Sequence, residues 1–295
     1  MIIPYMEPEF QNQHKLSQIY LKQFGYIGED NEHYVSVYRV GEKKTMNIKV
    51  KSFTAEVNIF DLPLPDMKDK RLFENLSSQL ESRYPKVITN LKNQKKLIPL
   101  DKDILNNFTA NILCRTDRFR DFISWCLKDS EAAVTLVSEI TLFSEGQEDK
   151  DELEFIIKHI PSDLQLNLVM PYIMTHLVQV FRRFKKVVLK HYANVGWLTS
   201  DNPVHIERFG QHSYLIPVEA EIYFPLSKDF CLFMFHPDSQ SSDNLLRKMK
   251  LDKVNLVNFG TCDDINKRMF VDNQAYLNFD YLIFNTQTDE TTFRE

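Results

Sequence analysis

Glycine is scarce in this chain, with only 7 residues among 295. Neither G-x-G-x-x-G nor G-x-x-x-x-G-K-[ST] occurs, which disfavours folds that hold a nucleotide phosphate on a glycine-rich loop. No Ser-His-Asp triad order and no H-E-x-x-H is present, so no familiar catalytic mechanism follows from a motif. The four cysteines form no C-x-x-C pair, which predicts reduced and mostly buried thiols at Cys114, Cys126, Cys231 and Cys262.

Signals for secretion or membrane insertion are also missing from the sequence. The first ten residues, MIIPYMEPEF, lack the basic start and apolar run of a secretory signal peptide. The most apolar window, residues 166–181, is interrupted by Pro171, His176 and Gln179 and is too short and too polar to span a bilayer. A net charge of -5 gives no overall attraction to nucleic acid or to an anionic membrane. We therefore expect a cytoplasmic protein without a membrane partner.

Apolar and aromatic residues are abundant. Hydrophobic residues make up 43% of the chain and 22 residues are phenylalanine, which predicts a substantial core with aromatic packing between helices. Residues 164–190 carry apolar side chains on nearly every face of a helix, so we expect a long central helix that its neighbours bury. Positive charge stabilises a helix C-terminus, which explains the basic residues at 182–190.

Shorter patterns predict elements on both sides of that helix. Helical spacing predicts helices over residues 11–24, 72–91 (kinked or broken at Pro85), 105–127, 244–258 and 263–273, whereas 132–143 fits helix or strand. Alternation predicts a hairpin of residues 33–40 and 46–53, with further strands at 197–198, 213–217, 221–226, 230–235 and 281–284. The acidic run 145–154 fits an exposed loop that leads into a short helix.

No internal repeat and no low-complexity linker divides the chain. We therefore predict a single α+β domain over residues 1–295, with an N-terminal helix and hairpin followed by a mostly helical body. The long buried helix is its expected centre. A small antiparallel sheet in the C-terminal third, accompanied by helices, completes the predicted fold.

Several polar side chains lie beside these apolar elements. His14 and Gln18 are four residues apart, so in a helix they would share a face next to the core stripe. Glu74 and Glu81 would lie about 10 Å apart along their helix, too far to share one metal ion, so we expect only one of them in any single site. Residues 199–203, T-S-D-N-P, fit a tight polar turn, which is common both in binding sites and in ordinary loops.

Three arginines cluster within two helical turns, at Arg115, Arg118 and Arg120. One interpretation is a solvated helix face on which the arginines form local ion pairs with Asp117 and Asp121. The other is a phosphate-binding cluster, because the planar guanidinium fork matches phosphate oxygens. The sequence leaves both interpretations open.

Three segments together resemble a known family. HKLSQIYLKQF is similar to an opening motif H-Y-V-P-Q-F-Y-L-x-x-F, LTSDNPV matches a central motif, and FPLS resembles a following P-L-S-P motif. These are motifs of the bacterial DUF4238 family of proteins of unknown function, and the resemblance covers most of the chain. The matched positions are His14, Gln18, Tyr20, Leu21, Phe24, Glu81, Arg115, Ser200, Asp201, Pro203, Pro225, Leu226 and Ser227. The chain departs from the motifs at Lys15, Ser17 and Lys228, as a diverged member would, and the resemblance implies no activity.

One hypothesis treats the matched polar residues as a catalytic site for hydrolysis of a phosphodiester or nucleotide. His14 would act as general acid or base, Asp201 and Glu81 as bases or metal ligands, and Arg115 as the group that stabilises phosphate charge. Substrate-binding roles would fall to Gln18, Arg115 and Ser200. The partner would then be nucleic acid or a nucleotide, and a divalent metal would be compatible with the carboxylates.

The alternative is a non-catalytic interaction or sensing protein in which the same residues serve the fold. His14 and Gln18 would then bond to the backbone of the polar turn, and Asp201 would cap that turn. Arg115 would pair with Glu81 inside the helical core. Exposure separates the two hypotheses, because a catalytic group borders a pocket that solvent reaches whereas a structural network is sealed and mutually satisfied.

Overall fold

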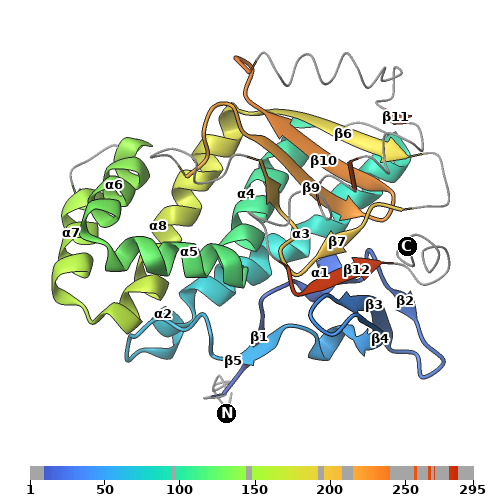
Figure 1. Cartoon of the computed structure of the whole chain (residues 1–295), viewed down its shortest axis with the longest axis horizontal. Coiled ribbons are helices and arrows are strands. Elements are labelled where there is room, and N and C mark those ends of the chain that lie inside the picture. The colour runs from blue at the N-terminus through green and yellow to red at the C-terminus, as the bar shows by residue number, and fades with distance from the viewer. Residues whose placement is uncertain are drawn as a thin grey trace, which may run out of the picture.

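The computed structural model describes residues 10–94, 97–143, 148–191, 196–207, 215–239, 256–257, 265–266, 269 and 279–284. Over these residues the chain has an α+β fold, as predicted, with a helical body beside two sheets (Figure 1). The helices are α1 (Gln18–Leu21), α2 (Met67–Lys70), α3 (Leu72–Gln94), α4 (Pro99–Arg115), α5 (Asp117–Lys128), α6 (Ser130–Ile140), α7 (Glu148–His159) and α8 (Ser162–Arg183), with 3-10 turns η1 (Val50–Ser52) and η2 (Thr141–Phe143). The strands are β1 (Asn12–His14), β2 (Tyr26–Ile27), β3 (His33–Arg39), β4 (Lys44–Lys49), β5 (Ala55–Val57), β6 (Lys185–His191), β7 (Thr199–Ser200), β8 (His205–Ile206), β9 (Glu221–Ser227), β10 (Phe230–Phe235), β11 (Leu256–Val257) and β12 (Tyr281–Phe284).

The strands form a more extensive arrangement than the one small sheet predicted. The first sheet has the order β11-β6-β10-β9-β8, and the second has the order β2-β3-β12-β7 with β4 also paired to β3. A separate ladder joins β1 to β5. The β11–β6 pair is parallel and the other described pairs are antiparallel. The C-terminal strand β12 thus completes the sheet of the N-terminal hairpin, a long-range pairing that local patterns do not reveal.

Both faces of the first sheet are buried. Along β10, Phe230 and Leu232 belong to the large core shared with the helices, while Cys231 and Phe233 belong to a second apolar cluster that includes Trp197. Alternate residues of a strand point to opposite faces of its sheet, so a strand that is covered on both sides carries apolar residues throughout. This explains the unbroken apolar runs of β9 and β10.

The predicted helix over residues 164–190 ends early. α8 stops at Arg183, and Lys185–His191 forms β6, which pairs with β10. The β-branched Val187 and Val188 favour a strand there, and pairing satisfies the backbone groups. The most buried helix is α4 rather than α8: twelve of the 17 residues of α4 are buried, against eight of the 22 in α8. The centre of the helical body therefore lies at α4.

Among the described residues, α8 is the helix long and apolar enough to cross a membrane by length and composition. In the fold it packs against α4, α5 and α7. Its buried residues include the polar Gln165 and His176, and the Gln165 amide donates a 2.8 Å hydrogen bond to the carbonyl of Ile160. This packing explains the apolar composition of α8, which is that of a core helix.

The predicted helix over residues 11–24 is wrong for its first half. Asn12–His14 pairs with Ala55–Val57 as a strand, and α1 begins only at Gln18. Buried Gln13 explains the extended conformation, because its amide donates to the Asp61 carboxylate at 2.6 Å and its carbonyl accepts from the Phe60 N–H at 2.7 Å. These long-range bonds replace the local bonds of a helix.

Several predicted elements are confirmed with shifted boundaries. The hairpin is β3–β4, and strands 221–226, 230–235 and 281–284 correspond to β9, β10 and β12. α3 continues through Pro85 without a break, and the ambiguous segment 132–143 is helical. The predicted helix 105–127 is interrupted at Thr116, which separates α4 from α5.

The remaining predicted elements differ more. The strand expected at 197–198 lies at Thr199–Ser200 and belongs to the second sheet. Within the strand expected at 213–217, the described residues 215–217 form no strand. The helices predicted at 244–258 and 263–273 fall largely outside the described residues, and Leu256–Val257 forms a strand there. The single-domain organisation stays a prediction.

Candidate functional site

Two buried tyrosines bind β9, the strand that carries the last segment of the family resemblance. The Tyr20 hydroxyl of α1 donates a 2.8 Å hydrogen bond to the carbonyl of Pro225 in β9. The Tyr84 hydroxyl of α3 donates to the next carbonyl of that strand, at Leu226. Both tyrosines are fully buried. The opening motif and the P-L-S segment therefore meet in the core, where they hold α1 and α3 against the first sheet.

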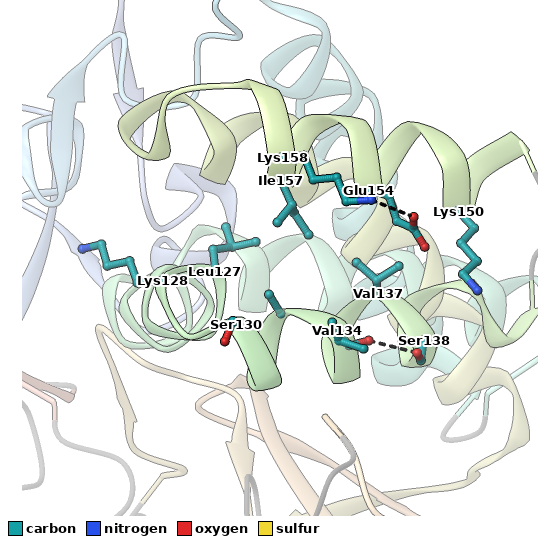
Figure 2. A pocket seen from close by; sticks show the side chains of 11 residues that line it. Leu127, Lys128, Ser130, Val134, Val137, Ser138, Lys150, Glu154, Ile157 and Lys158 are labelled. Carbon is teal, nitrogen blue, oxygen red and sulfur yellow. Dashed lines mark hydrogen bonds and ion pairs between the residues drawn. The ribbon is translucent and has the colours of Figure 1, made fainter.

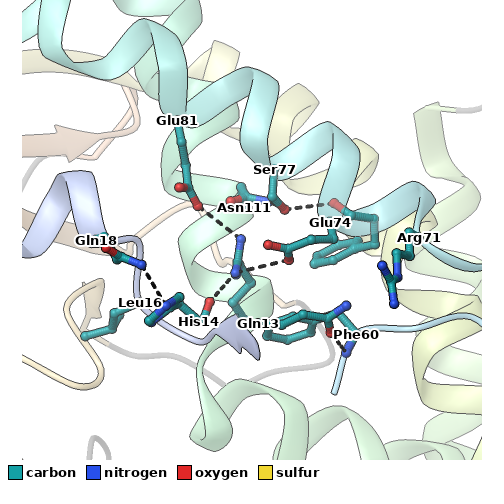
Figure 3. Close-up of polar contacts among 12 residues, drawn as sticks. Gln13, His14, Leu16, Gln18, Phe60, Arg71, Glu74, Ser77, Glu81 and Asn111 are labelled. Carbon is teal, nitrogen blue, oxygen red and sulfur yellow. Dashed lines mark hydrogen bonds and ion pairs between the residues drawn. The ribbon is translucent and has the colours of Figure 1, made fainter. Parts of the chain in front are cut away.

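A polar network is centred on Arg115, the last residue of α4. Figure 3 shows its labelled members His14, Gln18, Glu74 and Glu81. The Arg115 side chain is 1% exposed. Nη1 lies 3.1 Å from Oε1 of Glu81, and Nη2 lies 3.3 Å from Oε2 of Glu74. Nη2 also donates to the backbone carbonyl of His14. The guanidinium thus fastens β1 to two turns of α3.

The aromatic ring of Phe60 covers the same guanidinium. The Arg115 Cζ lies 4.7 Å from the ring centroid, in the range of a cation–π contact. Phe60 is held in turn by the bond from its N–H to Gln13. Carboxylates, a carbonyl and a ring therefore surround Arg115, and its charge is buried.

His14 contributes its backbone to this network more than its ring. The ring Nδ1 lies 3.3 Å from the Phe53 carbonyl, and Nε2 lies 2.8 Å from the amide nitrogen of Gln18. Nδ1 donates in this arrangement, and Nε2 accepts from Gln18. Burial lowers the pKa of His14, and the charge of Arg115 lowers it further. The ring is therefore mostly neutral at neutral pH.

The two glutamates of α3 balance the arginine. Burial raises the pKa of Glu74 and of Glu81, while the Arg115 charge opposes both shifts. The prediction that only one of these glutamates belongs to a site is wrong. The two nitrogens of a guanidinium diverge and glutamate side chains are long, so residues two helical turns apart converge on one cation.

The other two arginines of the predicted cluster have different polar partners, although Arg120 shares the Phe60 ring with Arg115. Arg118 pairs with Asp280 at 3.4 Å. Arg120 donates to the Asn167 amide oxygen at 2.7 Å and lies over the Phe60 ring. Thr116 separates α4 from α5, so Arg115 ends one helix while Arg118 and Arg120 belong to the next.

Asp201 lies apart from this network, just after β7. Its carboxylate accepts 3.1 Å hydrogen bonds from the backbone N–H groups of Asp280 and Tyr281. Its own N–H donates to the Tyr281 carbonyl at 3.1 Å. Burial raises the pKa of Asp201 to about 6, although these hydrogen bonds oppose the shift. Asp201 thus anchors the start of β12 and titrates near neutral pH.

Asp201 also borders an open cavity of about 530 Å³, hereafter the Asp201 cleft. Charged side chains dominate its lining: Lys15, Glu56, Asp117, Arg118, Asp121, Asp201 and Asp280. Lys15 pairs with Glu56 and lies 2.9 Å from Asp117, and Arg118 pairs with Asp280. Asp121 and Asp201 have no ion pair among the described residues, so the cleft carries an excess of negative charge.

Ser200 faces neither the cleft nor the network. It is fully buried in β7, and its hydroxyl accepts from the Asn202 N–H at 3.1 Å, which closes the polar turn. No hydrogen bond or ion pair between described residues joins His14 to Asp201. The two groups are linked through Phe53, whose carbonyl accepts from His14 and whose ring contacts Tyr281 edge-on at 5.3 Å.

Sequence reasoning missed most of the cleft. Asp117 and Asp121 are four residues apart on α5, and this spacing places them on one helix face. This spacing is a signal from which two acidic residues of the cleft can be predicted. Lys15 and Asp280 gave no such signal, because their partners lie 102 and 162 residues away along the chain. Among the described residues, no group of three His, Cys, Asp or Glu side chains is placed to hold a metal ion.

Comparison with known families agrees with the motifs of the sequence. The profile of the family described as "Protein of unknown function (DUF4238)" matches residues 12–275. The chain belongs to this family. Neither a search of curated proteins nor one of solved structures returned a match.

Proposed function

We propose that this protein is a non-catalytic binding or sensing protein that takes up a positively charged organic ligand in the Asp201 cleft. The observation that carries the proposal is the charge of the cleft lining, in which five carboxylates face two cations. Both cations are already paired, whereas Asp121 and Asp201 have no ion pair among the described residues. An ammonium or guanidinium group would offset part of this negative excess.

The burial of Arg115 supports a structural role for the network. A phosphate group must reach the guanidinium, yet Arg115 is 1% exposed and already contacts Glu74, Glu81 and the His14 carbonyl. Removing these partners to admit a substrate would leave buried charges unpaired. His14, Gln18, Glu81 and Arg115 then act together to fix the N-terminal segment on the helical body.

A second candidate function is hydrolysis with Asp201 as the base. The pKa of about 6 favours it, because a general base works best when its pKa lies near the working pH. Lys15 and Arg118 would then be the cations available to a phosphate, since both line the cleft. The negative excess of the cleft opposes an anionic substrate, so binding of a cation is the stronger proposal.

A ligand and activity panel tests the proposal. Agmatine carries an ammonium and a guanidinium group, and 4-guanidinobutyrate replaces the ammonium with a carboxylate. Agmatine should stabilise the protein against heat, and 4-guanidinobutyrate should not, because binding to the folded state raises the melting temperature. Hydrolysis of RNA, DNA and nucleotides is measured in parallel, with and without divalent metal. Hydrolysis that Asp201→Asn abolishes without loss of stability would support the second candidate instead.

A further inference from the structure

A second cavity, of about 470 Å³, lies between α6 and α7 and shares no lining residue with the Asp201 cleft (Figure 2). We call it the α6–α7 groove. Its floor is apolar and is formed by Leu127, Ala133, Val134, Val137 and Ile157. These residues come from the end of α5 and from the facing sides of α6 and α7. The groove is therefore a furrow between two helices with a hydrophobic base.

Val134 is the most unusual residue of the groove, because 68% of its surface is exposed. Ser130 and Ser138 lie one turn before and after it, so short side chains flank the valine. The Ser138 hydroxyl donates to the Val134 carbonyl at 2.9 Å, and its hydrogen is thereby already used. An incoming apolar side chain thus meets an accessible valine with little steric obstruction.

The rim of the groove is basic. Lys128, Lys150 and Lys158 lie along its edge, with the Lys128 side chain extending outward, and Glu154 is the one carboxylate among its lining residues (Figure 2). Glu154 lies 3.6 Å from Lys158 on the same helix. Lys128 and Lys150 have no ion pair among the described residues. This local positive charge contrasts with the chain's net charge of -5, so it favours an acidic partner at this place.

We propose that the α6–α7 groove binds an acidic amphipathic helix of a partner protein. A furrow between two helices accepts the side-chain ridge of a third helix, and an apolar stripe at i, i+4 and i+7 would cover Val134, Val137 and Ile157. Glutamates on both sides of that stripe would meet Lys128 and Lys150. The small area of the groove suits a transient complex rather than a permanent one.

The test uses a fluorescein-labelled helical peptide of about 18 residues, with leucines at i, i+4, i+7 and i+11 and glutamates on both flanks. A matched peptide carries lysine in place of each glutamate. Fluorescence polarisation with the full chain should give a Kd on the order of 10 µM for the acidic peptide. Val134→Asp should weaken binding about tenfold or more, because it places a charge on the apolar floor. Val57→Asp on β5 changes another exposed valine, outside the groove, and should alter binding less than about twofold.

Charge reversal supplies the second arm of the test. Lys150→Glu should weaken binding of the acidic peptide, and Lys92→Glu on the exposed side of α3 should not. Circular dichroism checks that each variant is folded. Absence of saturable binding, equal binding of the lysine peptide, or a Val134→Asp variant that binds like the wild type would overturn the proposal. Binding only to vesicles of anionic phospholipid would also overturn it, since a membrane would then be the partner.

Discussion

Arg115 and Glu81 are 34 residues apart in sequence, and their side chains meet at 3.1 Å in the core of the helical body. The contact joins the end of α4 to the middle of α3. Glu74 completes a carboxylate pair around the guanidinium, and the His14 carbonyl ties β1 to the same point. Arg115, its two glutamates and the His14 backbone thus join α4, α3 and β1, and Asp201 lies in a separate cleft. We call the contacts around Arg115 the joint.

The first prediction concerns this joint. Arg115→Met should lower the free energy of unfolding by about 3–5 kcal/mol, because Glu74 and Glu81 lose their buried counter-charge. Adding Glu74→Gln and Glu81→Gln to that variant should recover much of the loss. Arg118→Met is the control and should change stability by less than about 1 kcal/mol, since the Arg118–Asp280 pair is exposed. Urea denaturation checks the prediction, and equal midpoints for Arg115→Met and Arg118→Met would contradict it.

The second prediction concerns the pH dependence of Asp201. Its folded pKa of about 6 lies above the ordinary value of 3.8, so the folded state binds this proton more tightly than the unfolded state does. This contribution to stability is fully present below pH 3.8 and is lost as the pH rises through 6. Relative to Asp201→Asn, the wild type should therefore lose on the order of 2–3 kcal/mol between pH 4 and pH 7. If the stability of the two proteins changed by the same amount between pH 4 and pH 7, that result would rule out the shift.

A third prediction follows from a buried acid outside both sites. Burial raises the pKa of Glu139 to about 7, and Glu139 accepts a hydrogen bond from the Leu215 N–H. Stability from its protonated form is present below pH 4.5 and is lost as the pH rises through 7. Glu139→Gln, which keeps an acceptor, should therefore raise the melting temperature at pH 8 and change it little at pH 5. The same exchange at exposed Glu131 should change it at neither pH.

A second titratable group near Glu139, His176, also makes the stability depend on pH. His176 Nε2 lies 3.9 Å from Glu139 Oε1, and burial lowers the pKa of His176 to about 4. Its contribution to stability is present above pH 6.5 and is lost as the pH falls through 4, the opposite direction to Glu139. Both the wild type and Glu139→Gln carry this histidine, so their difference isolates the glutamate. A Glu139→Gln variant that is less stable than the wild type at pH 8 would show that the ionised carboxylate is needed.

The fourth prediction concerns the join between α1 and β9. Tyr20→Phe removes the donor to the Pro225 carbonyl, at a fully buried position, and should cost about 1–3 kcal/mol of unfolding free energy. Tyr26→Phe is the matched control, because the Tyr26 ring is partly exposed and stacks on Tyr34. Chemical denaturation of both variants gives the comparison. Equal stability of the two would show that the Tyr20 hydroxyl does not hold α1 in place.

Local periodicity was enough to predict part of the fold. β3 and β4 alternate in polarity over their length, and the continuous apolar runs of β9 and β10 are typical of strands buried on both faces. β6 was misread because Lys185–His191 follows an apolar helix without a glycine or proline, and its basic residues fit a helix end equally well. Pairing with β10, which is distant in sequence, decides the conformation.

The candidate site could be predicted only as a set of residues. His14, Gln18, Glu81 and Arg115 do share one network, yet nothing local indicates that Arg115 is sealed between α3 and β1. Burial depends on the packing of elements far apart in the chain. The separation of Asp201 from this network has the same origin, because β12 brings Asp280 and Tyr281 to the turn from the far end of the chain.

Isothermal titration of agmatine into the protein at pH 7.5 and at pH 5 tests the central claim most directly. We predict saturable binding at pH 7.5 that weakens several-fold at pH 5, because Asp201 gains a proton and the cleft loses its negative charge there. Asp201→Asn should bind weakly at both pH values, and Asp238→Asn, outside the cleft, should bind like the wild type. The absence of saturable agmatine binding at pH 7.5, or binding that Asp201→Asn leaves unchanged, would contradict the account.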